Sequence, residues 1–99
     1  MDLKAKLPRP VDDAIVSLVR REMAPFGLRG VTAAAGRDHD GDEVIYIDTE
    51  YEPQGPAIDL SVANGMIHKL CDKLWEMGEI RFPLVRHHFP EQRAYVGFS

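Results

Sequence analysis

Apolar residues recur at three- and four-residue spacing in two stretches of the chain, a spacing that is typical of a helix with one buried face. The first stripe consists of Val11, Ile15, Leu18, Val19, Met23 and Phe26. The second consists of Val62, Met66, Ile67, Leu70, Leu74 and Met77. Pro25 and Gly27 end the first helix, whereas Asp59 is a suitable N-cap for the second and Gly78 a suitable stop. We therefore predict two amphipathic helices, the second over residues 60–77.

Between the two helices the pattern indicates a β-hairpin. Residues 44–51 are rich in β-branched and aromatic side chains, and residues 28–37 precede them as the expected partner strand. Asp40-Gly41 is a favoured two-residue hairpin turn. With that turn, the predicted cross-strand pairs on one face are Ala35 with Tyr46, Ala33 with Asp48 and Val31 with Glu50. The other face, with Gly36, Ala34, Thr32, Ile45, Ile47 and Thr49, is then expected to pack against the helices, because small residues let a helix approach closely.

Residues 80–98 indicate a second hairpin, which turns at Phe89-Pro90-Glu91-Gln92 and places Arg86 opposite Tyr95. Pro83 cannot donate a ladder hydrogen bond, so its strand is expected at a sheet edge. The predicted fold class is α+β, a single domain in the order α-β-β-α-β-β, with two helices packed on one face of an antiparallel sheet of about four strands. Residues 1–10 are expected to form a loose N-terminal arm, and residues 11–99 the domain.

The charges are unevenly distributed along the chain. The formal net charge is -4, but residues 38–68 contain eight acidic side chains and no lysine or arginine. Proteins that bind nucleic acids gain most of their affinity by neutralising phosphates. Nucleic acid is therefore a disfavoured partner, and a basic protein or a second copy of the chain is favoured.

Composition restricts the remaining chemistry. Cys71 is the only cysteine, so the chain cannot form an internal disulfide or a thiolate zinc cluster. The sequence shows no apolar leader and no run long enough to span a membrane, so we expect a cytoplasmic protein. No motif indicates a cofactor or a small-molecule ligand.

The first functional hypothesis is a small interaction or regulatory module without catalytic residues. It would self-associate or bind a basic protein partner through the acidic hairpin, residues 38–52. The surface expected to carry this interaction is an apolar centre with an acidic rim on the sheet face away from the helices. Its residues are Val31, Ala33, Tyr46, Asp48, Glu50 and Glu52.

Two alternatives remain open. The first is a KH-like nucleic-acid-binding domain, because Gly27-Leu28-Arg29-Gly30 has the GxxG form that clamps a nucleic-acid backbone. Its contacts would come from Arg20, Arg21, Arg29 and Arg37, together with Lys4 and Lys6 near the N-terminus. The second is a metal-dependent hydrolase whose ligands would be drawn from His87, His88, Asp48 and Glu50, since imidazole and carboxylate groups suit zinc, manganese or iron. Adjacent histidines on a strand point to opposite faces, so only one of them could join such a cluster.

Overall fold

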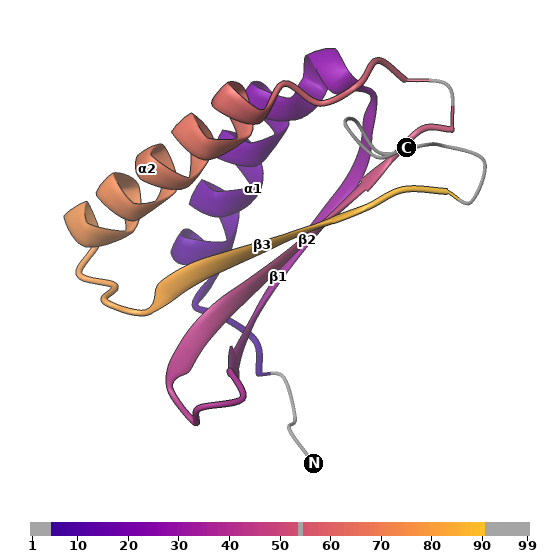
Figure 1. The fold of residues 1–99 in the computed structure, drawn as a ribbon. Coiled ribbons are helices and arrows are strands. Elements are labelled where there is room, and N and C mark those ends of the chain that lie inside the picture. The colour runs from indigo at the N-terminus through magenta and orange to yellow at the C-terminus, as the bar shows by residue number, and fades with distance from the viewer. Residues whose placement is uncertain (1–4, 54, 91–99) are drawn as a thin grey trace.

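The computed structural model describes residues 5–53 and 55–90, which fold into two α-helices, a short 3-10 helix and a sheet (Figure 1). The elements in chain order are α1 (Arg9–Met23), the short 3-10 helix η1 (Ala24–Phe26), β1 (Leu28–Arg37), β2 (Glu43–Tyr51), α2 (Leu60–Glu76) and β3 (Phe82–His88). Both long helices lie over the same face of the sheet, as Figure 1 shows. The predicted α+β class and the two helices on one face are confirmed.

The sheet is mixed, with the strand order β1-β2-β3. β1 pairs with β2 in antiparallel orientation, but β3 pairs with the other edge of β2 in parallel orientation. The prediction of a purely antiparallel sheet is therefore wrong. A parallel pair needs a crossover connection, and α2 provides it between β2 and β3. The described residues contain three strands. The predicted final strand and its pairing of Arg86 with Tyr95 lie outside them.

The helix signals in the sequence act as expected. Asp59 is the N-cap of α2, and its carboxylate accepts a 2.9 Å hydrogen bond from the backbone N–H of Ser61. Gly78 follows the helix with a φ of 80°, the left-handed conformation that glycine adopts without strain. Pro83 is the second residue of β3, and β3 is an edge strand of the described sheet, as its missing N–H requires.

The β1–β2 hairpin has a register shifted by one residue from the predicted one. Ala35 pairs with Ile45 rather than Tyr46, because the loop between the strands spans residues 38–42 instead of two residues. Asp38 organises this longer loop, since its carboxylate accepts hydrogen bonds of 2.9 Å from the backbone N–H groups of Asp40 and Asp42. A shift of one residue exchanges the two faces of a strand.

The shift changes the surface that β1 presents. The prediction that residues 45, 47 and 49 of β2 face the helices is confirmed, because all three are buried. On β1 the prediction is wrong. Val31, Ala33 and Ala35 pack with the core, whereas Gly36, Ala34 and Thr32 lie on the opposite face of the sheet, which we call the open face.

The core lies between the helices and the sheet. Its largest fully buried apolar side chains come from α1, β2 and α2, and they are Ile15, Met23, Ile45, Ile47, Tyr51, Met66, Leu70 and Leu74. Within the described part of the predicted arm, Ala5 forms an isolated antiparallel bridge with Ala35, and Leu7 is buried in the core. Within the described ranges, no helix has the length and apolar character needed to cross a bilayer.

Candidate functional site: the end of the molecule at residues 75–82

The segment from Trp75 to Phe82, which joins α2 to β3, is fixed by backbone hydrogen bonds. The N–H of Gly78 donates to the carbonyl of Trp75 over 3.0 Å, and the N–H of Glu79 donates to the carbonyl of Leu74 over 2.8 Å. These two bonds form the Schellman motif, which closes a helix C-terminus and sets the direction of the chain beyond it. The path from α2 towards β3 is therefore defined up to Glu79.

A charged clamp holds the next three residues. The guanidinium of Arg81 donates two hydrogen bonds of 2.8 Å to the carboxylate of Glu79, and the Arg81 backbone N–H donates a third of 2.9 Å. The Arg81 side chain is 23% exposed, and the Glu79 side chain is 11% exposed. These hydrogen bonds are the main reason why the pKa of Glu79 is lowered to about 2. The Glu79 carboxylate is therefore ionised at neutral pH. The clamp joins the residues on either side of Ile80 and so restrains its backbone.

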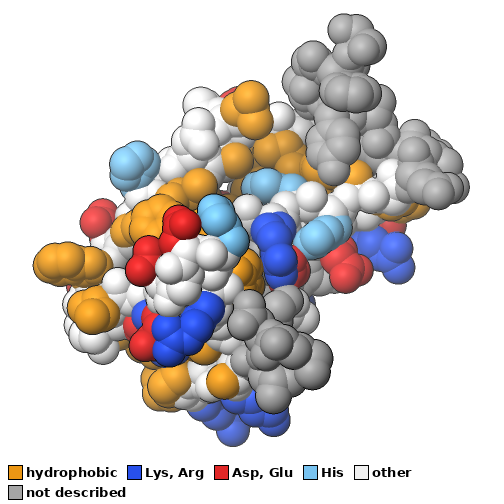
Figure 2. Space-filling view, turned by 60° about the horizontal axis from the view of Figure 1, so that its bottom comes forward, with side chains coloured by type: hydrophobic (Ala, Val, Ile, Leu, Met, Phe, Trp, Pro, Cys, Tyr) orange, Lys and Arg blue, Asp and Glu red, His pale blue; other side chains and the backbone are white. Residues whose placement is uncertain are grey.

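Exposed apolar side chains are concentrated on this segment. Among the residues that the structure describes, five large apolar side chains are exposed, and four of them lie within these eight residues. They are Trp75, 76% exposed, Met77, 36%, Ile80, 84%, and Phe82, 52%. Figure 2 shows hydrophobic side chains with charged ones beside them at the left edge of the molecule, where Figure 1 places the end of α2 and the start of β3. Single exposed apolar residues are ordinary, but a group containing tryptophan is typical of a binding surface.

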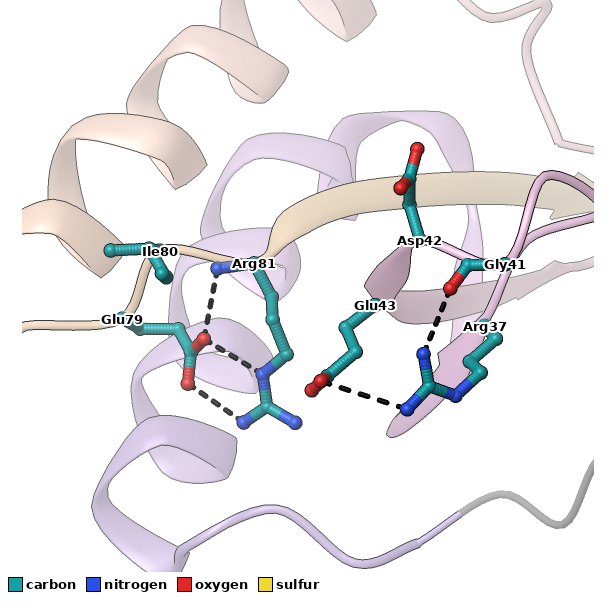
Figure 3. A pocket seen from close by; sticks show the side chains of 7 residues that line it. All are labelled: Arg37, Gly41, Asp42, Glu43, Glu79, Ile80 and Arg81. Carbon is teal, nitrogen blue, oxygen red and sulfur yellow. Dashed lines mark hydrogen bonds and ion pairs between the residues drawn. The ribbon is translucent and has the colours of Figure 1, made fainter.

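A pocket of about 450 Å³ lies between this segment and the hairpin tip, which we define as residues 38–43 (Figure 3). Its lining residues are Arg37, Gly41, Asp42, Glu43, Glu79, Ile80 and Arg81. The Glu43 carboxylate lies between the guanidinium groups of Arg37 and Arg81, with a 3.7 Å separation from Arg37 Nη2. Arg37 also donates a 2.8 Å hydrogen bond to the carbonyl of Gly41. The charges that line the pocket are thus largely matched within the chain.

The residues of the predicted interaction surface are divided between the two faces of the sheet. Val31 and Ala33 pack against the core, so the structure does not place them with the others. Tyr46 and Asp48 lie on the open face. Glu50 is exposed on the same face, and Glu52 follows the end of β2, with an oxygen 3.6 Å from Arg29 Nε.

On the open face Asp48 is held by two residues of β3. Arg86 donates hydrogen bonds of 2.8 and 2.9 Å to the two carboxylate oxygens of Asp48, and His88 Nε2 lies 2.8 Å from one of them. The guanidinium of Arg86 also stacks 4.4 Å from the ring centre of Tyr46. This carboxylate is therefore engaged within the chain, which reduces the acidity that the hairpin shows to a partner.

The four arginines of the nucleic-acid alternative do not form one patch. Arg29 and Arg37 lie eight residues apart on β1, a distance of roughly 26 Å at the usual strand rise. Each has a carboxylate nearby, from Glu52 and Glu43 respectively. Arg20 and Arg21 are exposed in the last turns of α1, on a different element. The Gly27-to-Gly30 segment connects η1 to β1 rather than two helices.

The residues of the metal alternative come together only in part. Asp48 and His88 are in contact, whereas His87 points to the helix side of the sheet, as the alternation of strand side chains predicts. There its Nδ1 lies 2.7 Å from Tyr51 Oη and 3.0 Å from Thr49 Oγ1. Burial lowers the pKa of His87, and the charge of His88 acts in the same direction. Across residues 5–53 and 55–90, no three histidine, cysteine, aspartate or glutamate side chains are grouped as metal ligands would be.

Sequence reasoning missed the 75–82 segment as a site. Trp75 lies outside the apolar stripe of the second helix, and Ile80 begins the predicted hairpin over residues 80–98. The signal was present in the sequence, because Ile80 follows a helix stop and stands between Glu79 and Arg81. An apolar residue that stands between opposite charges, two positions after a helix-ending glycine, has little of the core within reach.

Comparison with known proteins adds no relative from which a function could be inferred. No protein-family model, no curated protein and no solved structure matches this chain.

Proposed function

We propose that this chain is a protein-interaction module that docks a partner through the end of the molecule formed by the 75–82 segment and the hairpin tip. The observation that carries the proposal is the exposure of Trp75, Ile80 and Phe82 on one short segment. Tryptophan is enriched among the residues that dominate binding energy, and such anchors are surrounded by polar residues that exclude water. The charged residues of the hairpin tip and of the Glu79–Arg81 clamp are the polar residues around these apolar side chains.

Rigidity supports the proposal as much as exposure does. Binding costs the free energy of ordering side chains and loops, and a segment already fixed in its bound conformation avoids most of that cost. Here the Schellman motif fixes the exit from α2, and the Glu79–Arg81 clamp fixes the backbone on both sides of Ile80. An exposed isoleucine held in this way is suited to act as an anchor.

The proposal keeps the acidic hairpin in the interaction but gives it a smaller role. Glu43 and Asp48 already face arginines of the same chain, so the acidic hairpin contributes a polar rim rather than the main attraction. The apolar residues of the 75–82 segment supply most of the binding free energy in this scheme, because burial of apolar surface is the dominant favourable contribution to association.

Site-specific photocrosslinking tests the proposal in cells. A photoreactive residue at Glu76, which is exposed within the segment, leaves the four apolar side chains intact. The matched control places the same residue at Asn64, which is exposed nearer the other end of α2. We expect a protein adduct from position 76, none from position 64, and loss of the adduct when Ile80→Asp is added. Equal adducts from both positions, or an adduct that persists with Ile80→Asp, would contradict the proposal.

A further inference from the structure

We infer that the partner docked on this end of the molecule is a positively charged protein segment, with a lysine or arginine that enters the pocket beside Ile80. The inference rests on the proposed function and names the chemistry of its partner. Three observations carry it: the location of the chain's net charge, an acidic side chain that the chain leaves unpaired, and the position of that side chain next to an exposed apolar residue.

The negative charge of the chain is concentrated at the hairpin tip and the 75–82 segment, even when the flanking Arg37, Asp72 and Lys73 are counted with them. Together these residues include seven acidic and three basic side chains, and their formal charge of -4 equals that of the whole chain. The rest of the sequence therefore has as many acidic as basic side chains. A negative surface attracts cationic partners, and it repels both a second copy of itself and the phosphates of a nucleic acid.

Ion pairs within the chain use every lysine and arginine of this group. The three pairs are Arg37–Glu43, Lys73–Glu76 and Arg81–Glu79. Among the described residues, no lysine or arginine pairs with the aspartates of the hairpin tip, which are Asp38, Asp40 and Asp42. The Asp42 carboxylate forms no hydrogen bond or ion pair within residues 5–53 and 55–90, and Figure 3 shows it directed away from Arg37 and Arg81. This carboxylate is therefore available to a cation from outside the chain.

The unpaired carboxylate lies next to an exposed apolar anchor. Asp42 and Ile80 both line the 450 Å³ pocket, and Ile80 is 84% exposed. Lysine and arginine have an apolar stem that ends in a cation, so one such side chain can pack its stem on Ile80 and bring its charge to Asp42. A purely apolar side chain would cover Ile80 but leave Asp42 without a partner, and an acidic one would be repelled.

The positive charge of the partner is expected to govern selection and rate rather than most of the affinity. Charges at the rim of an interface steer the approach of a partner and discourage wrong ones, whereas a few well-packed anchors supply most of the binding energy. The hairpin tip thus keeps the smaller energetic role described above, and association is expected to slow as the salt concentration rises.

Selection from a random-peptide display library on the purified full chain tests the inference. We expect the enriched peptides to contain lysine and arginine well above their frequency in the unselected library. A synthetic copy of an enriched peptide should bind the chain in fluorescence anisotropy, more tightly at low than at high salt. Asp42→Lys, and Ile80→Ser, which changes no charge, should each weaken this binding about tenfold. The matched control is Leu60→Lys with Asn64→Lys, because both residues are exposed in the first half of α2 and the double change raises the net charge as much as Asp42→Lys does. It should leave binding nearly unchanged.

Several outcomes would overturn the inference. A selection that enriches no basic peptides would do so, as would binding that Asp42→Lys or Ile80→Ser leaves intact, or that the control double variant weakens equally. Circular dichroism of every variant excludes unfolding as the cause. If the enriched peptides are neutral or acidic while position 76 still gives an Ile80-dependent adduct, the basic partner is refuted and the proposed function stands. If no adduct forms either, both are refuted.

Discussion

Replacing Glu79 with alanine should destabilise the protein more than replacing Arg81 with alanine, and the difference follows from the hydrogen bonds of the clamp. Glu79→Ala removes all three hydrogen bonds to the carboxylate, whereas Arg81→Ala removes only the two from the guanidinium and keeps the one from the backbone N–H. Hydrogen bonds to charged groups contribute about 1.5–3 kcal/mol each to the free energy of unfolding when they are fully buried. At a partly exposed site solvent screening reduces this, so we expect about 1–2 kcal/mol for Glu79→Ala and about half as much for Arg81→Ala.

The double-mutant cycle isolates the pair itself. Urea unfolding of the wild type, the two single variants and the double variant should give a coupling free energy of about 0.5–1 kcal/mol that decreases in high salt. The pair Lys73–Glu76 is the control, because its side chains are 48% and 71% exposed and its atoms are 3.8 Å apart. Its coupling should be below about 0.5 kcal/mol. The reasoning is refuted if Arg81→Ala is the more destabilising change, or if the two pairs couple equally.

Acid provides a second measure of the same clamp. The pKa of Glu79 is lowered from 4.5 to about 2 in the folded chain. The unfolded chain therefore binds the proton more readily between these values, and the stability that Glu79 contributes is complete above its unfolded pKa. That contribution should decline as the pH falls from about 5 towards 2. In Glu79→Gln the decline over this range should be smaller, as unfolding curves recorded at successive pH values will show.

Other positions give independent tests. Gly65→Ala should stabilise the protein by about 0.5–1 kcal/mol in thermal or urea melts, because a Cβ at this position in α2 meets no atom within 4 Å; a loss of stability would contradict this. Gly27→Ala should destabilise it, since Gly27 has a φ of 79° and an added Cβ would lie 3.2 Å from the Cα of Gly55. His87 has a lowered pKa, so the unfolded state takes up its proton first, and stability should fall as the pH drops below about 6.5. His87→Gln should reduce that loss, and an unchanged pH profile would refute the assignment.

The helices could be predicted from the sequence because their signals are local. The apolar stripe of α2, its N-cap at Asp59 and its stop at Gly78 each depend on residues within a few positions of one another. The direction of β3 could not be predicted in the same way. A strand that follows a helix can return parallel to an earlier strand, and nothing within residues 82–88 marks which neighbour it will join.

The predicted interaction surface depended on one local detail that the sequence left ambiguous, the length of the turn between residues 37 and 43. Asp40-Gly41 favours a two-residue turn, but the carboxylate of Asp38 holds a longer loop and moves the register by one position. That single step placed Val31 and Ala33 against the helices and removed them from the predicted surface. The exposure of Ile80 is likewise a property of three-dimensional packing, because it results from how the chain leaves α2 and enters β3.

The central position of β2 also sets an order for folding. Its pairing with β1 joins neighbouring segments across a short loop, whereas its pairing with β3 joins Val44 to Phe82, 38 positions later in the chain. Closing the larger loop costs more chain entropy, so the hairpin should form early and β3 should join the sheet late. Substitutions in the hairpin should then mainly slow refolding, and those in β3 should mainly accelerate unfolding. The 75–82 segment would be completed with that last step, so a chain that has not finished folding would lack its docking surface.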